Sequence, residues 1–128
     1  SKIEKKWGYE LLIENNDRYV MTELKMNKGN KWSIQYNEKK KEKVYVLSGK
    51  MKVYIGDELD SLDEIIMNPH DSLTLEPFKI HRMEALEDSI YLEASTPALD
   101  DVVRLEDEYG REGTSEAWLF NYKERENK

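Results

Sequence analysis

The sequence predicts an all-β fold, either a sandwich or a barrel of short strands. Short runs of β-branched, aromatic and aliphatic residues recur along most of the chain. Clusters of Asn, Asp, Gly and Pro separate these runs, and a helical pattern occurs only near the C-terminus. Regular spacing of this kind is typical of β-sandwiches and barrels, whereas parallel sheets need long helical crossovers between strands.

The expected strands follow one another with short connections. An apolar run ends at the turn Asn15-Asn16-Asp17, and Asn27-Lys28-Gly29-Asn30 forms the next turn. The expected strands after the first turn are residues 18–26, 31–36, 44–47, 50–55, 64–67, 72–75, 81–86, 89–94 and 102–105. The two strands that flank Ser48-Gly49 are expected to pair as a hairpin. Residues 115–126 are expected to form a short helix, since Ser115 could cap it and apolar residues group at 117–122.

Length and composition limit the kind of protein. A chain of 128 residues suits a single domain with one core, so residues 1–128 are expected to form one domain. The chain has no cysteine and its first residues lack the apolar core of a signal peptide, which favours a cytoplasmic location. The net charge of −7 opposes binding to nucleic acid or to a membrane surface, and no apolar run has the length of a membrane span. A small anionic ligand held by a few local cations is compatible with this charge.

Residues 29–49, GNKWSIQYNEKKKEKVYVLSG, contain three side chains that could hold a metal. Gln35 and Asn37 are two residues apart and therefore point to one face of a strand. Glu42 could join them from the neighbouring strand of a hairpin. The same pattern fits a polar strand face that meets water, and water is the commoner environment for such a face.

This stretch resembles the first motif of the cupin superfamily, G-x5-H-x-H-x4-E-x6-G, which supplies three metal ligands to the inside of a small β-barrel. Gly29, Glu42 and Gly49 match the motif, while Gln35 and Asn37 occupy its two histidine positions. Cupins of the mannose-6-phosphate isomerase kind look similar, with glutamine at the first of these positions. Asn37 places a neutral amide oxygen where an imidazole would bind, which lowers the expected affinity for zinc and favours harder ions.

His81 resembles the histidine of the second cupin motif, G-x5-P-x-G-x2-H-x3-N, which is the fourth metal ligand. The other motif positions hold His70, Glu76, Phe78 and Ala85. The resemblance implies a divalent metal, zinc or another transition metal, bound by Gln35, Asn37, Glu42 and His81, and weakened or lost because of Asn37. A lone histidine on a strand is otherwise a common hydrogen-bonded core residue.

Residues 95–111, STPALDDVVRLEDEYGR, closely resemble the end of the cupin domain in bacterial type II mannose-6-phosphate isomerase / mannose-1-phosphate guanylyltransferase. Lys5-Lys6-Trp7-Gly8 resembles the start of that domain, so the likeness spans about residues 4–111, followed by the helical extension 115–126. The resemblance implies a cupin fold, a double-stranded β-helix or jelly-roll barrel. It also implies that Arg104 faces the substrate, where a guanidinium could hold a phosphate or an enediolate oxygen. A surface ion pair of Arg104 with a nearby acidic residue is the alternative.

The activity that the resemblance implies is metal-assisted aldose–ketose isomerisation of a sugar phosphate, within carbohydrate metabolism. Glu93 could be an inward general base and Arg104 the group that steadies the enediolate. Lys79, Arg82 and Arg111 are further candidates for phosphate binding, and each also fits a solvated surface charge. One alternative is a noncatalytic cupin that binds a sugar or a partner, and another is a cupin with a different metal-dependent activity, such as epimerisation or oxygenation. A homodimer is expected, because cupins are commonly dimers and exposed strand edges favour pairing.

Overall fold

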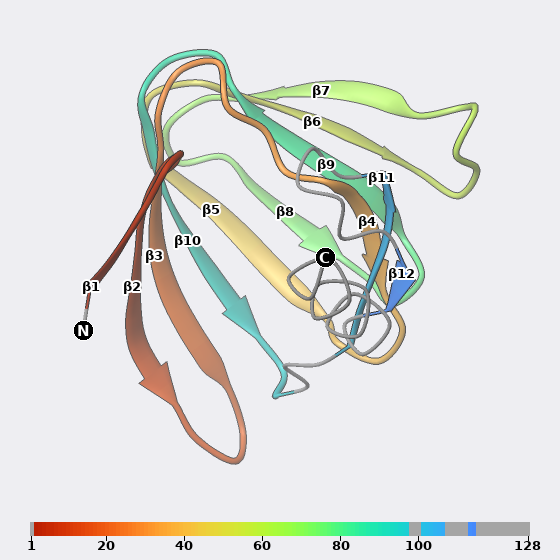
Figure 1. Cartoon of the computed structure of the whole chain (residues 1–128), viewed down its shortest axis with the longest axis horizontal. Coiled ribbons are helices and arrows are strands. Elements are labelled where there is room, and N and C mark those ends of the chain that lie inside the picture. The colour runs from red at the N-terminus through yellow and green to blue at the C-terminus, as the bar shows by residue number, and fades with distance from the viewer. Residues whose placement is uncertain (1, 98–100, 107–112, 115–128) are drawn as a thin grey trace, which may run out of the picture.

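The computed structural model describes residues 2–97, 101–106 and 113–114, which form two antiparallel six-stranded sheets and no helix (Figure 1). The first sheet contains, in spatial order, β1 (Lys2–Lys5), β2 (Gly8–Asn15), β3 (Val20–Met26), β10 (Ser89–Ser95), β5 (Glu42–Ser48) and β8 (Ser72–Leu75). The second contains β12 (Gly113–Thr114), β11 (Val102–Glu106), β4 (Ile34–Asn37), β9 (Ile80–Ala85), β6 (Met51–Gly56) and β7 (Asp63–Met67).

The all-β prediction is confirmed, and the strands from β3 to β11 lie close to the predicted ranges. Two short strands of the described residues were not predicted, β12 and β1. β1 was missed because it is a polar run without the alternation that marks a half-buried strand. It pairs with β2 at the edge of the first sheet. The predicted helix over residues 115–126 lies outside the described residues.

Two predicted hairpins are wrong. β5 and β6 flank Ser48-Gly49 but lie in different sheets, since β5 pairs with β10 and β8 while β6 pairs with β9 and β7. β4 and β5 are also in different sheets, so Glu42 does not lie on a strand beside Gln35. A tight turn between two alternating runs looks the same in sequence whether the chain folds back within one sheet or crosses to the other.

Gly49 is the residue at which the chain leaves the first sheet. Its φ is +89°, which favours glycine. A Cβ at this position would overlap Ser89 and the carbonyl oxygen of Asp88. The position therefore requires glycine for two reasons, its backbone conformation and the close approach of the turn before β10.

The core lies between the sheets and is formed by the inward-facing residues of both. β3 alternates buried and half-buried residues along its whole length, as a strand with one face on the core should. The core cluster consists of Leu24, Met26, Val44, Val46, Met51, Val53, Met67, Leu75, Met83, Ala85 and Tyr91. Leu24 and Met26 also line a cavity beside this core, so the apolar packing ends where the polar site begins.

The described residues contain no helix that is long and apolar enough to cross a membrane.

Candidate functional site

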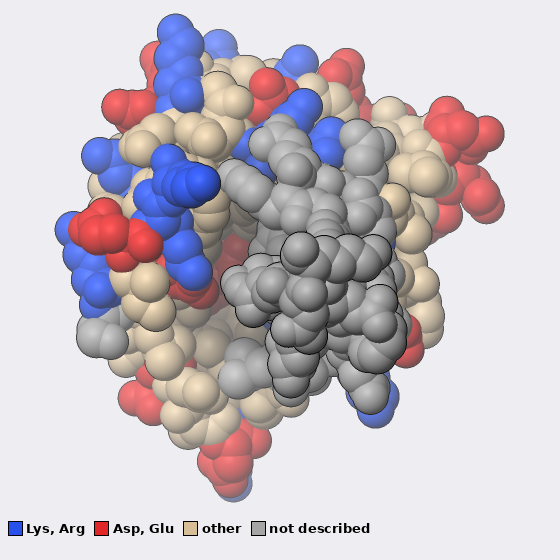
Figure 2. Space-filling view, in the orientation of Figure 1, with Lys and Arg blue, Asp and Glu red and all other residues tan. Residues whose placement is uncertain are grey.

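A cavity of about 260 Å³ lies between the two sheets, and charged side chains form much of its wall. Among the described residues, three carboxyl side chains and three cationic side chains line it: Glu10, Glu42, Glu93, Lys31, Lys40 and Arg104. Figure 2 shows a hollow on one side of the molecule, with acidic atoms in its depth and basic side chains beside it. Such a wall offers both hydrogen-bond donors and acceptors to a polar ligand.

Three of the four predicted metal ligands meet at this cavity. Gln35 and Asn37 reach it from β4, and Glu42 reaches it from the start of β5 in the opposite sheet. The amide nitrogen Nδ2 of Asn37 donates to Oε1 of Glu42 across 3.2 Å. Ser33, on the same face of the chain, donates its hydroxyl hydrogen to Oε1 of Gln35 across 2.7 Å. Since Ser33 and Asn37 are buried, this polar face points into the molecule and the alternative of a water-facing strand is wrong.

His81 lies on β9 directly opposite Gln35 in the strand pairing, so the two side chains share the inner face of the sheet. It is buried and does not itself line the cavity. Its Nδ1 lies 2.8 Å from the carbonyl oxygen of Lys79. A carbonyl oxygen only accepts, so Nδ1 carries the proton and Nε2 keeps its lone pair. Burial lowers the pKa of His81, which keeps the ring neutral at physiological pH.

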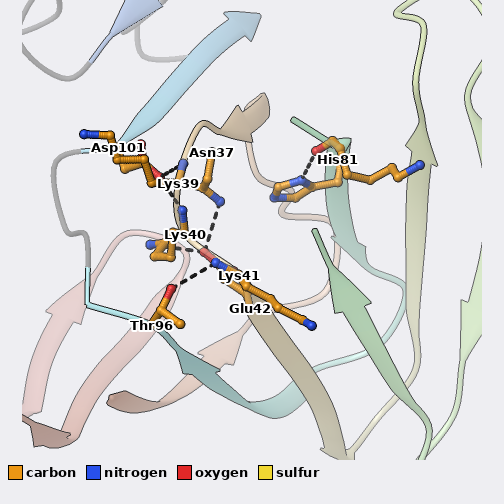
Figure 3. A network of polar contacts seen from close by, with 9 residues as sticks. Asn37, Lys39, Lys40, Lys41, Glu42, His81, Thr96 and Asp101 are labelled. Carbon is orange, nitrogen blue, oxygen red and sulfur yellow. Dashed lines mark hydrogen bonds and ion pairs between the residues drawn. The ribbon is translucent and has the colours of Figure 1, made fainter. Parts of the chain in front are cut away.

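Two buried atoms in this region suggest a ligand position. In the described part of the chain, Oδ1 of Asn37 and Nε2 of His81 have no hydrogen-bond partner. Figure 3 shows the ring of His81 directed toward the side where Asn37 meets Glu42. Buried acceptors are normally paired, so these two atoms fit a bound cation or a donor group of a ligand. Together with a carboxylate oxygen of Glu42 they are suitable donors for a divalent ion, although no three His, Cys, Asp or Glu residues cluster for this purpose among the described residues.

Lys40 is a site residue that the sequence analysis missed. Lys40 belongs to the charged run 38–43, and such a run would ordinarily be expected to form a solvated loop. Its Nζ lies 3.1 Å from Oε1 of Glu42, and the exposed fractions of the two side chains are only 17% and 6%. The neighbouring Lys39 and Lys41 are exposed. A signal was present, because a residue two positions before Glu42 in an extended chain lies on the same face.

The loop that carries Lys40 is held by contacts to distant parts of the chain (Figure 3). Oδ2 of Asp101 accepts hydrogen bonds from the backbone nitrogens of Lys39, at 2.7 Å, and Lys40, at 2.6 Å. The backbone nitrogen of Lys41 donates to the hydroxyl oxygen of Thr96 at 3.1 Å. The inward direction of Lys40 is therefore set by a fixed backbone and does not depend on its own ion pair alone.

Glu93 faces the cavity from β10, on the same side of the strand as the core residue Tyr91. Strand alternation left this direction open. Burial and, to a smaller extent, the nearby charge of Glu42 raise the pKa of Glu93 to about 8, although the charge of Lys40 partly opposes both effects. A carboxyl group with this pKa is mostly protonated at neutral pH and can lose its proton at slightly higher pH.

The four predicted cationic side chains have different positions. Arg104, on β11 opposite Gln35, lines the cavity. Lys79 is outside it and forms an ion pair with Asp57, with 2.6 Å between Nζ and Oδ1. Arg82 is also outside the cavity lining and donates from Nε to the carbonyl oxygen of Trp32 at 2.8 Å. Arg111 lies outside the described residues.

Other cavity residues could not be singled out from the sequence. Glu10 comes from β2 and Lys31 from the segment before β4, and no pattern in the sequence marks either of them. Trp7 and Trp32 add indole rings to the wall. The indole nitrogen of Trp32 donates to the hydroxyl of Tyr91 at 2.9 Å, which fixes this ring between the core and the cavity.

The two antiparallel six-stranded sheets give the chain the cupin fold, which it shares with an RmlC-like cupin from Shewanella frigidimarina at a TM-score of 0.65 and 16% identity over 77% of this chain and 84% of that one. No protein-family model matches the chain, and no curated protein sequence matches it. Solved structures with the same fold include the capsular polysaccharide assembling protein CapF from Staphylococcus aureus, with a TM-score of 0.74 and 17% identity over 83% of this chain and 31% of that one. They also include KdgF from Halomonas sp., with a TM-score of 0.65 and 16% identity over 77% of this chain and 88% of that one. A third is oxalate decarboxylase from Lactobacillus farciminis, with a TM-score of 0.68 and 15% identity over 82% of this chain and 33% of that one.

The chain spans about a third of the length of CapF and of oxalate decarboxylase, and most of the length of KdgF. At these identities the likeness establishes the fold and leaves the reaction to be argued from the site.

Proposed function

We propose that the cavity is the active site of an aldose–ketose isomerase for a sugar phosphate, of the mannose-6-phosphate isomerase kind. The observation that supports this best is that Glu93 and Arg104 line the same cavity, one from each sheet. Isomerisation requires a group that moves a proton between adjacent carbons and a group that stabilises the negative oxygen formed on the way. A carboxyl group and a guanidinium group facing one small cavity supply both.

Glu93 is the proposed proton-transfer residue. A general acid–base group works best when its pKa is close to the working pH, and burial brings the pKa of Glu93 to about 8. Its carboxylate form would remove the proton from the carbon next to the carbonyl, and the hydroxyl proton on that carbon would pass to the former carbonyl oxygen. The resulting carboxylic acid would then return its proton to the former carbonyl carbon, which leaves the new carbonyl on the adjacent carbon. Activity should therefore increase as the pH rises toward this pKa.

Arg104 is the proposed anion-binding residue, because a guanidinium offers paired donors to a phosphate or to an enediolate oxygen. The indole rings of Trp7 and Trp32 provide apolar surface for the C–H faces of a sugar. Lys79 and Arg82 lie outside the cavity lining and are not needed for this role.

Gln35, Asn37, Glu42 and His81 would hold a divalent metal in this site. Such an ion, when bound, would polarise the carbonyl and hydroxyl oxygens of the substrate. The neutral amides in this set make a weaker site than imidazoles would, especially for zinc.

A noncatalytic cupin that binds a sugar without turnover is the second candidate. The contact of Lys40 with Glu42 favours it, since the only carboxylate of the ligand set is already paired with a cation. Asn37 favours it as well, because an amide oxygen binds a transition metal such as zinc more weakly than an imidazole nitrogen does.

The conversion of mannose-6-phosphate to fructose-6-phosphate, followed by NMR, tests the isomerase. The wild type should show turnover, and Glu93→Gln should reduce it by roughly 100-fold or more, the usual effect of losing a general base. Glu58→Gln, at an exposed glutamate, is the matched control and should match the wild type. Wild-type protein that binds mannose-6-phosphate without converting it, with and without added Zn²⁺, Mn²⁺ or Co²⁺, would favour the binding protein.

A further inference from the structure

We propose that the ammonium group of Lys40 is the built-in cation of this site: it occupies the position on Glu42 that a divalent metal would take. The protein consequently binds divalent metals weakly, and removing the Lys40 charge should create a tighter metal site. This role of Lys40 rests on the proposed site but not on turnover, since metal affinity is measured without a substrate.

The first argument is the position of the ammonium group. Nζ of Lys40 lies 3.1 Å from Oε1 of Glu42, and the same oxygen accepts the hydrogen bond from Asn37 at 3.2 Å. Lys40 and Glu42 both line the cavity. A metal bound between Asn37 and Glu42 would have to displace this contact or share the carboxylate with a positive charge about 3 Å away.

The second argument is charge compensation. The side chain of Glu42 is only 6% exposed, and a buried carboxylate is costly unless a cation or strong donors compensate it. Lys40 supplies that compensation. The other members of the ligand set are the amides Gln35 and Asn37 and the neutral imidazole of His81, so none offers a second negative charge to attract a divalent ion past Lys40.

The third argument is that the Lys40 position is prepared by the fold. Asp101 and Thr96 hold the backbone from Lys39 to Lys41 through three hydrogen bonds, and both lie about 55 residues or more further along the chain. Of these three consecutive lysines only Lys40 has its side chain mostly covered, whereas Lys41 forms an exposed ion pair with Glu76. A surface lysine that met Glu42 by chance would not require such a fixed loop.

The test is a titration of Zn²⁺ and, separately, Mn²⁺ into chelator-treated, dialysed full-length protein, followed by calorimetry. The variants are Lys40→Met, which keeps the length of the side chain and removes its charge, and Lys41→Met, the same change one residue away on the exposed side. Lys40→Met should bind at least one of the two ions at least tenfold more tightly than the wild type. Lys41→Met should bind like the wild type.

A double variant, Lys40→Met with Glu42→Gln, tests whether the metal gained by Lys40→Met binds to Glu42. Its binding should return to the weak level of the wild type, because the carboxylate released by the first change is removed by the second. Circular dichroism reports whether each variant is folded, and Lys40→Gln replaces Lys40→Met if that protein fails to fold.

The proposal is overturned if the wild type binds either ion tightly, with a dissociation constant below about a micromolar, or if neutralising Lys40 leaves metal affinity unchanged. An equal gain in Lys41→Met would also overturn it, since the effect would then reflect overall charge. The absence of isomerase turnover in the wild type would reject the proposed reaction, but it would not affect the metal affinities by which the role of Lys40 is judged.

Discussion

Replacing Glu93 by glutamine should change the way in which the stability of the fold depends on pH. The pKa of Glu93 is about 8 in the folded protein, whereas an unburied glutamate has a pKa of 4.5. Between these two values the folded chain holds one proton at this position that the unfolded chain has lost. The free energy of unfolding therefore falls as pH rises through this window.

The size of the effect follows from the window. Each pH unit inside this window lowers the free energy of unfolding by about 1.4 kcal/mol. Near pH 8 the loss per unit is smaller, because Glu93 is half-ionised in the folded protein, so raising the pH from about 6 to about 8 should lower the free energy of unfolding by about 2 kcal/mol. Glutamine cannot ionise and does not make this contribution. The stability difference between Glu93→Gln and the wild type should therefore shift by about 2 kcal/mol in favour of the variant over this range.

Urea unfolding, monitored by tryptophan fluorescence near pH 6 and near pH 8, measures this difference. Glu58→Gln, the same substitution at an exposed position, should follow the wild type at both pH values. Other titrating groups, such as His81, are present in all three proteins and cancel in the comparison. Parallel pH dependence in the wild type and Glu93→Gln would refute the reasoning, because Glu93 would then ionise as an ordinary, well-hydrated carboxyl group.

Three further predictions concern the metal set and the turn. Since burial lowers the pKa of His81 below its ordinary value of 6.5, the contribution of His81 to stability should decrease as pH falls below about 6.5. His81→Gln should therefore gain stability relative to the wild type over this range in urea unfolding, and a constant difference between the two proteins would contradict this. Gly49→Ala should destabilise the fold by about 1–3 kcal/mol more than Gly29→Ala in thermal or urea unfolding. Both glycines have φ +89°, but of the two only Gly49 lacks space for a Cβ. Equal destabilisation by the two substitutions would show that backbone conformation alone matters. Asn37→His should raise Zn²⁺ or Co²⁺ affinity in calorimetry, since imidazole binds these ions better than an amide oxygen, and unchanged affinity would mean that this position does not contact the metal.

The sequence by itself determined the class of fold and most of the strand positions. Alternation and turn residues are local properties, so runs such as 44–47 and 50–55 could be recognised one at a time. The spacing of Gln35 and Asn37 also fixed that both point the same way. The pairing of strands could not be obtained in this manner, because it depends on which edges are free in three dimensions, and the turn at Gly49 crosses between sheets instead of closing a hairpin.

Only the tertiary structure decided which charges share the cavity. It brings Glu42 to Asn37 across the space between two sheets, turns Lys40 inward through contacts with Asp101, and separates Lys79 from Arg104. The pKa of Glu93 and the free lone pair of His81 likewise depend on burial and on partners distant in sequence. Electrostatic interactions act over a few ångströms in space regardless of separation along the chain, so the sequence supplied the candidate residues and the packing of the two sheets selected among them.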